Sequence, residues 1–147
     1  MVSWQIQAQN SIDMIQRIQS VWLLAASVCL FGTLSDSVSF YIGIIPPEHF
    51  TAKTNVFILV LTVILATSSL IAIFLYKNRK LQFRISLGAL LADLAMIGLY
   101  LYESRKYSSG GYSLTSVVVF VVPVCLFLAV RGIYKDQKLL KSVNRLR

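Results

Sequence analysis

Four long apolar segments alternate with short polar segments along the chain. The apolar segments cover residues 18–34, 55–76, 85–102 and 114–130. A helix rises about 1.5 Å per residue, so about 17 to 25 apolar residues are needed to cross a hydrocarbon core roughly 30 Å thick. Backbone polar groups inside lipid must bond within their own segment, which favours a helix for each of these segments. The pattern predicts an all-α integral membrane protein: a four-transmembrane-helix bundle that forms one membrane domain over residues 1–147.

The basic residues are distributed unevenly between the two ends of the predicted helices. One side carries Arg17, the basic segment 77–84 and the basic residues that follow the fourth helix. The opposite side carries fewer cations, balanced by carboxylates: Lys53, Arg105 and Lys106 against Asp36, Glu48 and Glu103. Because lysine and arginine in short loops are retained on the cytoplasmic side, this asymmetry predicts that both termini are cytoplasmic.

The two ends of the chain lie outside the predicted helices. Residues 1–17 place a few apolar side chains among glutamines, which fits either a short interfacial helix or an extended start. Residues 131–147 place apolar side chains near i, i+3, i+4 and i+7 spacing, which predicts a basic amphipathic helix. We expect this cytoplasmic tail to extend the fourth helix along the lipid headgroups, and docking to a cytoplasmic partner is the alternative. The residues expected to contact headgroups or a partner are Arg131, Lys135, Lys138, Lys141, Arg145 and Arg147.

The predicted outer loops contain two local patterns. Residues 38–44 have apolar side chains at every second position, which predicts a short strand or extended segment at the outer interface. Pro46 and Pro47 are expected to end this segment. In the second outer loop, Gly110 and Gly111 predict a turn.

Composition supports the membrane class. Of the 147 residues, 56% are hydrophobic and 14% are charged, whereas charged residues make up about 25% of typical soluble domains. The formal net charge of +8 lies close to helix ends, without the aromatic or glycine pattern of a nucleic-acid-binding module. We therefore expect no nucleic-acid partner, and interpret the charge as a topology signal that also attracts anionic lipids.

Residue types that bind metals or attack substrates are scarce. Cys29 and Cys125 differ in predicted depth by about 9 Å, more than the roughly 7 Å limit between the Cα atoms of a disulfide. Both are expected to act as small buried hydrophobic residues. His49 has no second ligand at i+3 or i+4. A hydrolase requires a nucleophile beside a base, and no such site can be named from the sequence, so a membrane enzyme is the alternative that lacks a named site. We expect no metal, no cofactor and no catalytic residue, and predict that the protein is not an enzyme.

Asp93 lies near the middle of the third apolar segment. An unpaired ionised carboxylate at that depth costs about 2.5–3.5 kcal/mol on insertion scales, so the side chain must face protein or water. We expect desolvation to favour its neutral form. Thr67, Ser68 and Ser69 lie at the same level of the second helix, and at least one of their hydroxyls can face the third. With Asp93 they form the predicted intramembrane polar cluster.

Three roles remain open for Asp93. The carboxyl group can donate a hydrogen bond between helices, contact a polar group of a partner subunit, or relay a proton or ion. A single acid gives weak support to a relay, because transport pathways usually combine several polar groups or broken, repeated segments.

The sequence contains two candidate starts, Met1 and Met14. A chain that begins at Met14 would place Arg17, an apolar run and Cys29 at a spacing similar to that of a lipoprotein signal. Val28, however, stands where a lipoprotein peptidase requires a small residue. We expect the first helix to be a retained anchor, and cleavage is the alternative.

Both ends of the chain resemble a known family. The segment MIQRIQSVWLLAA from Met14 and the closing segment RGIYKDQKLLKSVNRLR are similar to a family of short uncharacterised four-helix inner-membrane proteins of Bacteroidetes, a domain of unknown function. In that family the chain typically starts at the methionine that matches Met14, and Asn144 stands where an aspartate is expected. The resemblance implies the fold and the location in the inner membrane, and it implies no particular activity.

These observations lead to one functional expectation and one alternative. We expect a non-catalytic, multi-pass protein of the bacterial inner (cytoplasmic) membrane that is an accessory, assembly or scaffolding component of a membrane complex. Its expected partners are the bilayer with its anionic lipids, and another protein or further copies of itself. The alternative is a small transporter or proton-coupled unit that uses Asp93 with Thr67 or Ser68.

Overall fold

The structure is a computed structural model that describes residues 18–44, 49–106 and 110–144. Helices account for most of this part of the chain, with short strands between them. The first helix covers Ile18–Gly32. The other elements, in chain order, are β1 (Tyr41–Gly43), β2 (His49–Phe50), α2 (Val56–Phe74), η1 (Leu75–Lys77), α3 (Arg79–Ser104), β3 (Gly110–Tyr112), η2 (Leu114–Ser116) and α4 (Val117–Asn144).

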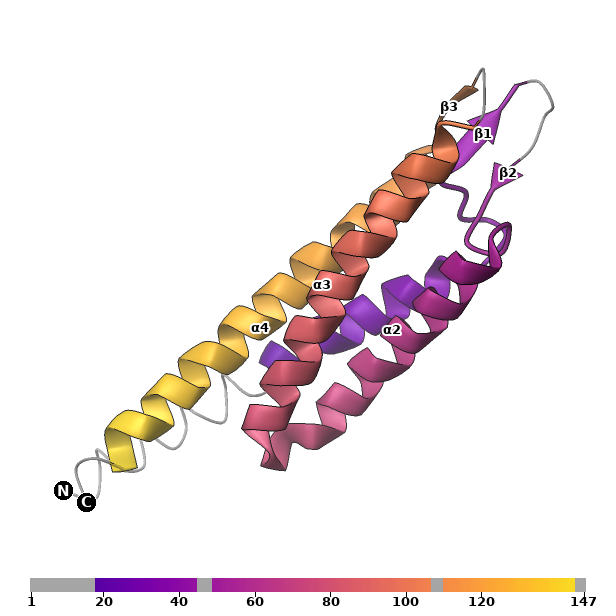
Figure 1. The fold of residues 1–147 in the computed structure, drawn as a ribbon. Coiled ribbons are helices and arrows are strands. Elements are labelled where there is room, and N and C mark those ends of the chain that lie inside the picture. Colours follow the sequence, from indigo (N-terminus) through magenta and orange to yellow (C-terminus); the bar gives the residue numbers. More distant parts are fainter. Residues whose placement is uncertain (1–17, 45–48, 107–109, 145–147) are drawn as a thin grey trace.

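The described helices run alternately up and down an elongated bundle (Figure 1). α3 packs against both α2 and α4. The first helix lies against α4, where the side chain of Gln19 fills the space beside Gly132. The strands form a small sheet at one end of the bundle, which we name the sheet end. The opposite end holds η1 and the start of α3, and we name it the turn end.

Small residues fill much of the bundle interior, and large apolar side chains face outward. Ala26, Ala66 and Ala129 are completely buried, whereas Phe57 and Phe74 on α2 are 82% and 77% exposed. On a soluble protein, a large apolar surface of this kind would mark an interaction site. Small residues between helices and an apolar exterior are typical of helices that pack in lipid. The distribution of side chains is therefore suited to a bilayer.

Three helices of the described part are long and apolar enough to cross a membrane: α2, α3 and the stretch Leu114–Lys138. The helix Ile18–Gly32 is apolar but shorter, so length and composition support three of the four predicted spans. This helix ends at Gly32 rather than at residue 34 because the chain changes there from α-helical hydrogen bonds to tighter turns. The backbone N–H groups of Leu34 and Ser35 each donate to the carbonyl three residues earlier, at 3.1 and 3.0 Å.

Two helices extend beyond the apolar segments that the sequence predicts. α3 begins at Arg79 rather than at residue 85, and α4 continues to Asn144 rather than ending near residue 130. Hydropathy locates the part of a helix that can lie in lipid, whereas the polar turns next to it can be equally helical. The tail is therefore a direct continuation of α4 as far as Asn144.

β1 is the central strand of a small antiparallel sheet with the order β2-β1-β3. Tyr41 of β1 lies opposite Phe50 of β2 and Tyr112 of β3. The strand predicted from the alternating pattern is confirmed at β1. The turn predicted at Gly110 and Gly111 is wrong, because both residues belong to β3 and pair with β1. The predicted stop at prolines 46 and 47 lies outside the described residues.

Replacing Gly110 with alanine is expected to break the pairing of β3 with β1. Gly110 has a φ of +157°, and a Cβ atom there would lie 2.3 Å from the carbonyl oxygen of Ile42. A backbone neighbour cannot rotate away, so we expect a loss of about 1–3 kcal/mol in the free energy of unfolding, measured by denaturation in detergent. Gly111→Ala is the control, because nothing lies within 4 Å of its Cβ position. Equal stability of the two variants would contradict the observed register.

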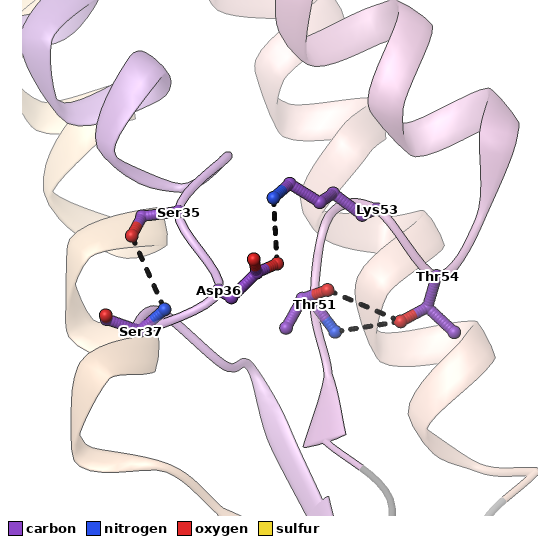
Figure 2. A network of polar contacts seen from close by, with 6 residues as sticks. All are labelled: Ser35, Asp36, Ser37, Thr51, Lys53 and Thr54. Atoms are coloured by element: carbon purple, nitrogen blue, oxygen red, sulfur yellow. Dashed lines mark hydrogen bonds and ion pairs between the residues drawn. The ribbon is translucent and has the colours of Figure 1, made fainter.

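Polar contacts join the chain segments on either side of the sheet (Figure 2). Lys53 Nζ lies 2.8 Å from Asp36 Oδ1, which links the loop after the first helix to the segment before α2. The Thr51 N–H donates to Thr54 Oγ1 at 3.1 Å. The Lys53–Asp36 pair is exposed, so its contribution to stability is small, at about 1 kcal/mol or less. Its main consequence is that it neutralises a cation at the sheet end.

Candidate functional site

The buried face of α3 is largely polar. Its buried residues recur every three or four positions, which places them on one face of the helix. These residues are Gln82, Ser86, Ala89, Asp93, Met96, Tyr100 and Ser104. Leu91 and Leu94 lie on the opposite side and are 62% and 51% exposed. α3 therefore directs a row of polar groups toward the bundle interior along much of its length.

Asp93 is the most unusual group on this face. Its side chain is completely buried, and neither carboxylate oxygen has a hydrogen-bond partner among the described residues. Ser86 Oγ, about two turns earlier on the same face, also has no partner there. Buried polar groups in native proteins are nearly always hydrogen-bonded. A pair of unsatisfied oxygens in the middle of an apolar helix therefore identifies Asp93 as the first candidate for a functional role.

The structure does not connect the predicted hydroxyl cluster to Asp93. Thr67 is exposed, Ser68 is half-buried and Ser69 is buried. Each of their hydroxyls donates to a carbonyl of α2 itself, at 2.8–2.9 Å. Serine and threonine commonly satisfy themselves in this way inside helices. No hydrogen bond joins the predicted cluster across the two helices in the described part of the chain.

The polar contact between α2 and α3 involves Thr62, which the sequence analysis missed. Thr62 is completely buried, and its hydroxyl donates to the carbonyl of Ile58 at 2.7 Å. The same hydroxyl lies 3.3 Å from Met96 Sδ, on the buried face of α3. The sequence feature that points to Thr62 is its spacing from Ala66 and Ser69, which places a small or polar residue on one face of α2 in each turn.

A second buried polar group lies between α3 and α4 at the turn end. Arg79 Nη1 pairs with Asp136 Oδ2, and the two side chains are 19% and 2% exposed. Gln137 Nε2 also donates to the backbone carbonyl of Arg79, at 2.7 Å. Because Arg79 is the first residue of α3, these bonds fix α4 beside the start of that helix. The sequence alone does not indicate this pair, since the two residues are far apart in the chain.

The basic residues predicted to contact headgroups or a partner lie partly within the described region. Arg131, Lys135 and Lys138 are exposed on α4, with no ion-pair partner among the described residues. Lys141 lies within α4, and its side chain is not among those that the structure describes. Residues 145 and 147 also lie outside the described part of the chain.

The groups considered for redox and metal chemistry are the two cysteines and His49. Cys29 and Cys125 are free thiols, half-buried and buried respectively. His49 is exposed at the start of β2. Within the described ranges, the structure brings no three His, Cys, Asp or Glu side chains together in a way that could hold a metal ion.

The described part of the chain is mostly helical, and three of its helices are long and apolar enough to cross a membrane. The chain belongs to the family described as "Domain of unknown function (DUF4293)", whose model matches residues 15–146. The prediction of an uncharacterised domain family is thereby confirmed. No curated protein and no solved structure matches the chain.

Proposed function

We propose that the protein is a multi-pass component of the bacterial inner membrane, with four spanning helices and the turn end on the cytoplasmic side. Charge supports this orientation. Of the three described cations at the sheet end, Lys53 and Lys106 each pair with a carboxylate, and Arg105 is exposed with no ion-pair partner among the described residues. Five cations near the turn end are exposed and have no ion-pair partner among the described residues: Lys80, Arg84, Arg131, Lys135 and Lys138. Unpaired positive charge of this kind is retained on the cytoplasmic side of a membrane.

Within that membrane, the protein acts as a non-catalytic accessory, assembly or scaffolding subunit of a larger complex. The observation that carries this proposal is the end of α4. Asp136 and Gln137 fix α4 to the first residue of α3, and the helix then continues to Asn144. Figure 1 shows this extension reaching past the start of α3. A helix held in a fixed direction, with exposed cations such as Lys138, is suited to bind an acidic partner at the membrane surface.

Extraction in a mild detergent, from native membranes at native expression level, tests this role. The expected result is one assembly that contains this protein and at least one different protein in a fixed ratio. Lys138→Glu reverses a charge on α4 and is expected to weaken the assembly. Arg105→Glu makes the same change at an exposed position at the sheet end and should leave it intact. Recovery of the protein alone, or only with copies of itself, would contradict the proposal.

A small proton-coupled transporter is the second candidate, and the buried face of α3 is the observation in its favour. This face also carries polar groups before and after Asp93: Gln82 and Ser86 lie toward the turn end, and Tyr100 lies toward the sheet end. A row of several polar groups resembles a transport pathway more than the single acid that the sequence indicates.

Asp93→Asn separates the two candidates. Asparagine has nearly the same shape and keeps hydrogen-bonding capacity, but it cannot release a proton. We expect the free energy of unfolding to change by less than about 1 kcal/mol, because no hydrogen bond to a described residue is lost. Proton flux into proteoliposomes, followed with a pH-sensitive dye, gives the functional result. A proton-coupled unit requires flux that is lost in Asp93→Asn and kept in Thr67→Val, and equal flux in wild type and Asp93→Asn would exclude it.

A further inference from the structure

We propose that a hollow between the first helix and α4, at the turn end, binds one anionic phospholipid. The hollow has a volume of about 260 Å³. Residues that line it include Gln19, Trp22, Leu128, Arg131, Gly132 and Lys135. This inference rests on the membrane position proposed above, and it is independent of the accessory role.

Two cations border the hollow, and neither has an ion-pair partner among the described residues. Arg131 and Lys135 are four residues apart on α4, so they lie on the same face of the helix, where like charges repel. The carboxylate of the neighbouring Asp136 is directed to Arg79 on α3. Among the described residues, the lining contains no Asp or Glu. A phosphate group placed between the two cations would relieve their repulsion and neutralise them.

Gln19 adds a hydrogen-bond donor to the same hollow. The residue is 4% exposed, and its amide Nε2 has no partner among the described residues. Gly132 makes room for this side chain, because a Cβ atom there would lie 2.7 Å from Gln19 Cγ. Since buried amides are nearly always hydrogen-bonded, a phosphate or ester oxygen of a ligand is a suitable acceptor for this unused donor.

The apolar part of the lining favours a lipid over free phosphate. Trp22 and Leu128 line the hollow together with Ile18, which is 57% exposed. Tryptophan is enriched at the membrane interface, where its ring contacts both acyl chains and headgroups. Free phosphate would use only the cations, whereas a phospholipid would also cover the apolar side chains. Basic pockets between helices near the cytoplasmic surface are known sites for anionic headgroups.

Quenching of Trp22 fluorescence tests this site in vesicles. The only other tryptophan is Trp4, so a Trp4→Phe background makes the emission report on Trp22. The full chain is reconstituted into phosphatidylcholine vesicles that contain an equal small fraction of either brominated phosphatidylglycerol or brominated phosphatidylcholine. We expect the anionic lipid to bind with an affinity about 30-fold higher, because each of the two cations contributes about a fivefold preference for an anionic headgroup. Saturation at one lipid per protein is expected.

Matched variants assign the preference to the hollow. Arg131→Gln with Lys135→Gln is expected to abolish the preference for the anionic lipid. Lys80→Gln with Arg84→Gln removes two exposed cations at the same spacing from α3, and it should leave the preference unchanged. A melting curve of each double variant verifies that the fold is retained.

Each other outcome has a separate meaning. Equal quenching by both lipids, or equal loss of the preference in both double variants, would overturn the site while leaving membrane insertion in place. Absence of quenching by either lipid would overturn the proposed membrane position itself. Inorganic phosphate, added at constant ionic strength, should not displace the brominated lipid, and displacement would identify the site as one for a free anion.

Discussion

Truncation of Phe40 to alanine is expected to lower the free energy of unfolding by about 3–5 kcal/mol, the usual cost of deleting a large buried aromatic side chain. Phe40 is 2% exposed, and its ring centroid lies 4.8 Å from that of Tyr100 and 5.7 Å from that of Tyr112. Tyr100 belongs to α3, whereas Tyr112 belongs to β3. Loss of the Phe40 ring therefore opens a cavity where the sheet packs on the bundle.

Unfolding of detergent-purified protein by heat or denaturant measures this effect. Ile44→Ala is the control, because Ile44 lies one residue beyond β1 and is 66% exposed. We expect this control to change the stability by less than about 0.5 kcal/mol. If Phe40→Ala costs no more than the control, Phe40 does not join the sheet to the helices in the way described.

Arg79→Ala is expected to lower the free energy of unfolding by a similar amount, about 3–5 kcal/mol. The substitution leaves the buried Asp136 carboxylate without its counter-charge. Asp136→Ala should cost less, since the Arg79 side chain is 19% exposed and can turn its charge toward water. The carbonyl of Arg79 would still accept a hydrogen bond from Gln137 in both variants. The order of the two effects is thus part of the prediction.

A double-mutant cycle isolates the ion pair from the rest of the contact. Arg79→Met combined with Asp136→Leu removes both charges and retains most of the side-chain volume. Well-packed apolar replacements of buried ion pairs are often neutral or stabilising, so this double variant should be more stable than Arg79→Met alone, which leaves the Asp136 carboxylate unpaired. Additive losses in the cycle would mean that the two side chains do not interact.

The hydrophobic pattern located α2, α3 and the apolar part of α4, because each contains a long apolar run. It also located β1, since its side chains alternate. It could not locate β3, because Gly110 and Gly111 have no side chains to show alternation. That strand exists through pairing with β1, a partner more than sixty residues earlier in the chain.

The candidate site was predictable in part. An acid in the middle of an apolar segment must be shielded from lipid, and Asp93 is indeed buried. Which hydroxyl of α2 reaches the buried face of α3 depends on the rotation of α2 about its axis, and packing against neighbouring helices sets that rotation. That rotation buries Thr62 and exposes Thr67. The Arg79–Asp136 pair depends likewise on the alignment of α3 with α4.

We propose a membrane-inserted bundle with its sheet end outside and its turn end in the cytoplasm. The direct test is labelling with a membrane-impermeant maleimide in a Cys29→Ala, Cys125→Ala background. Ser37→Cys probes an exposed position at the sheet end and Lys138→Cys an exposed position on α4. In cells whose outer envelope is opened but whose inner membrane is intact, we expect the maleimide to react with Ser37→Cys and not with Lys138→Cys. Lys138→Cys should react only after the inner membrane is permeabilised. The reverse pattern, or labelling of both positions before permeabilisation, would contradict it.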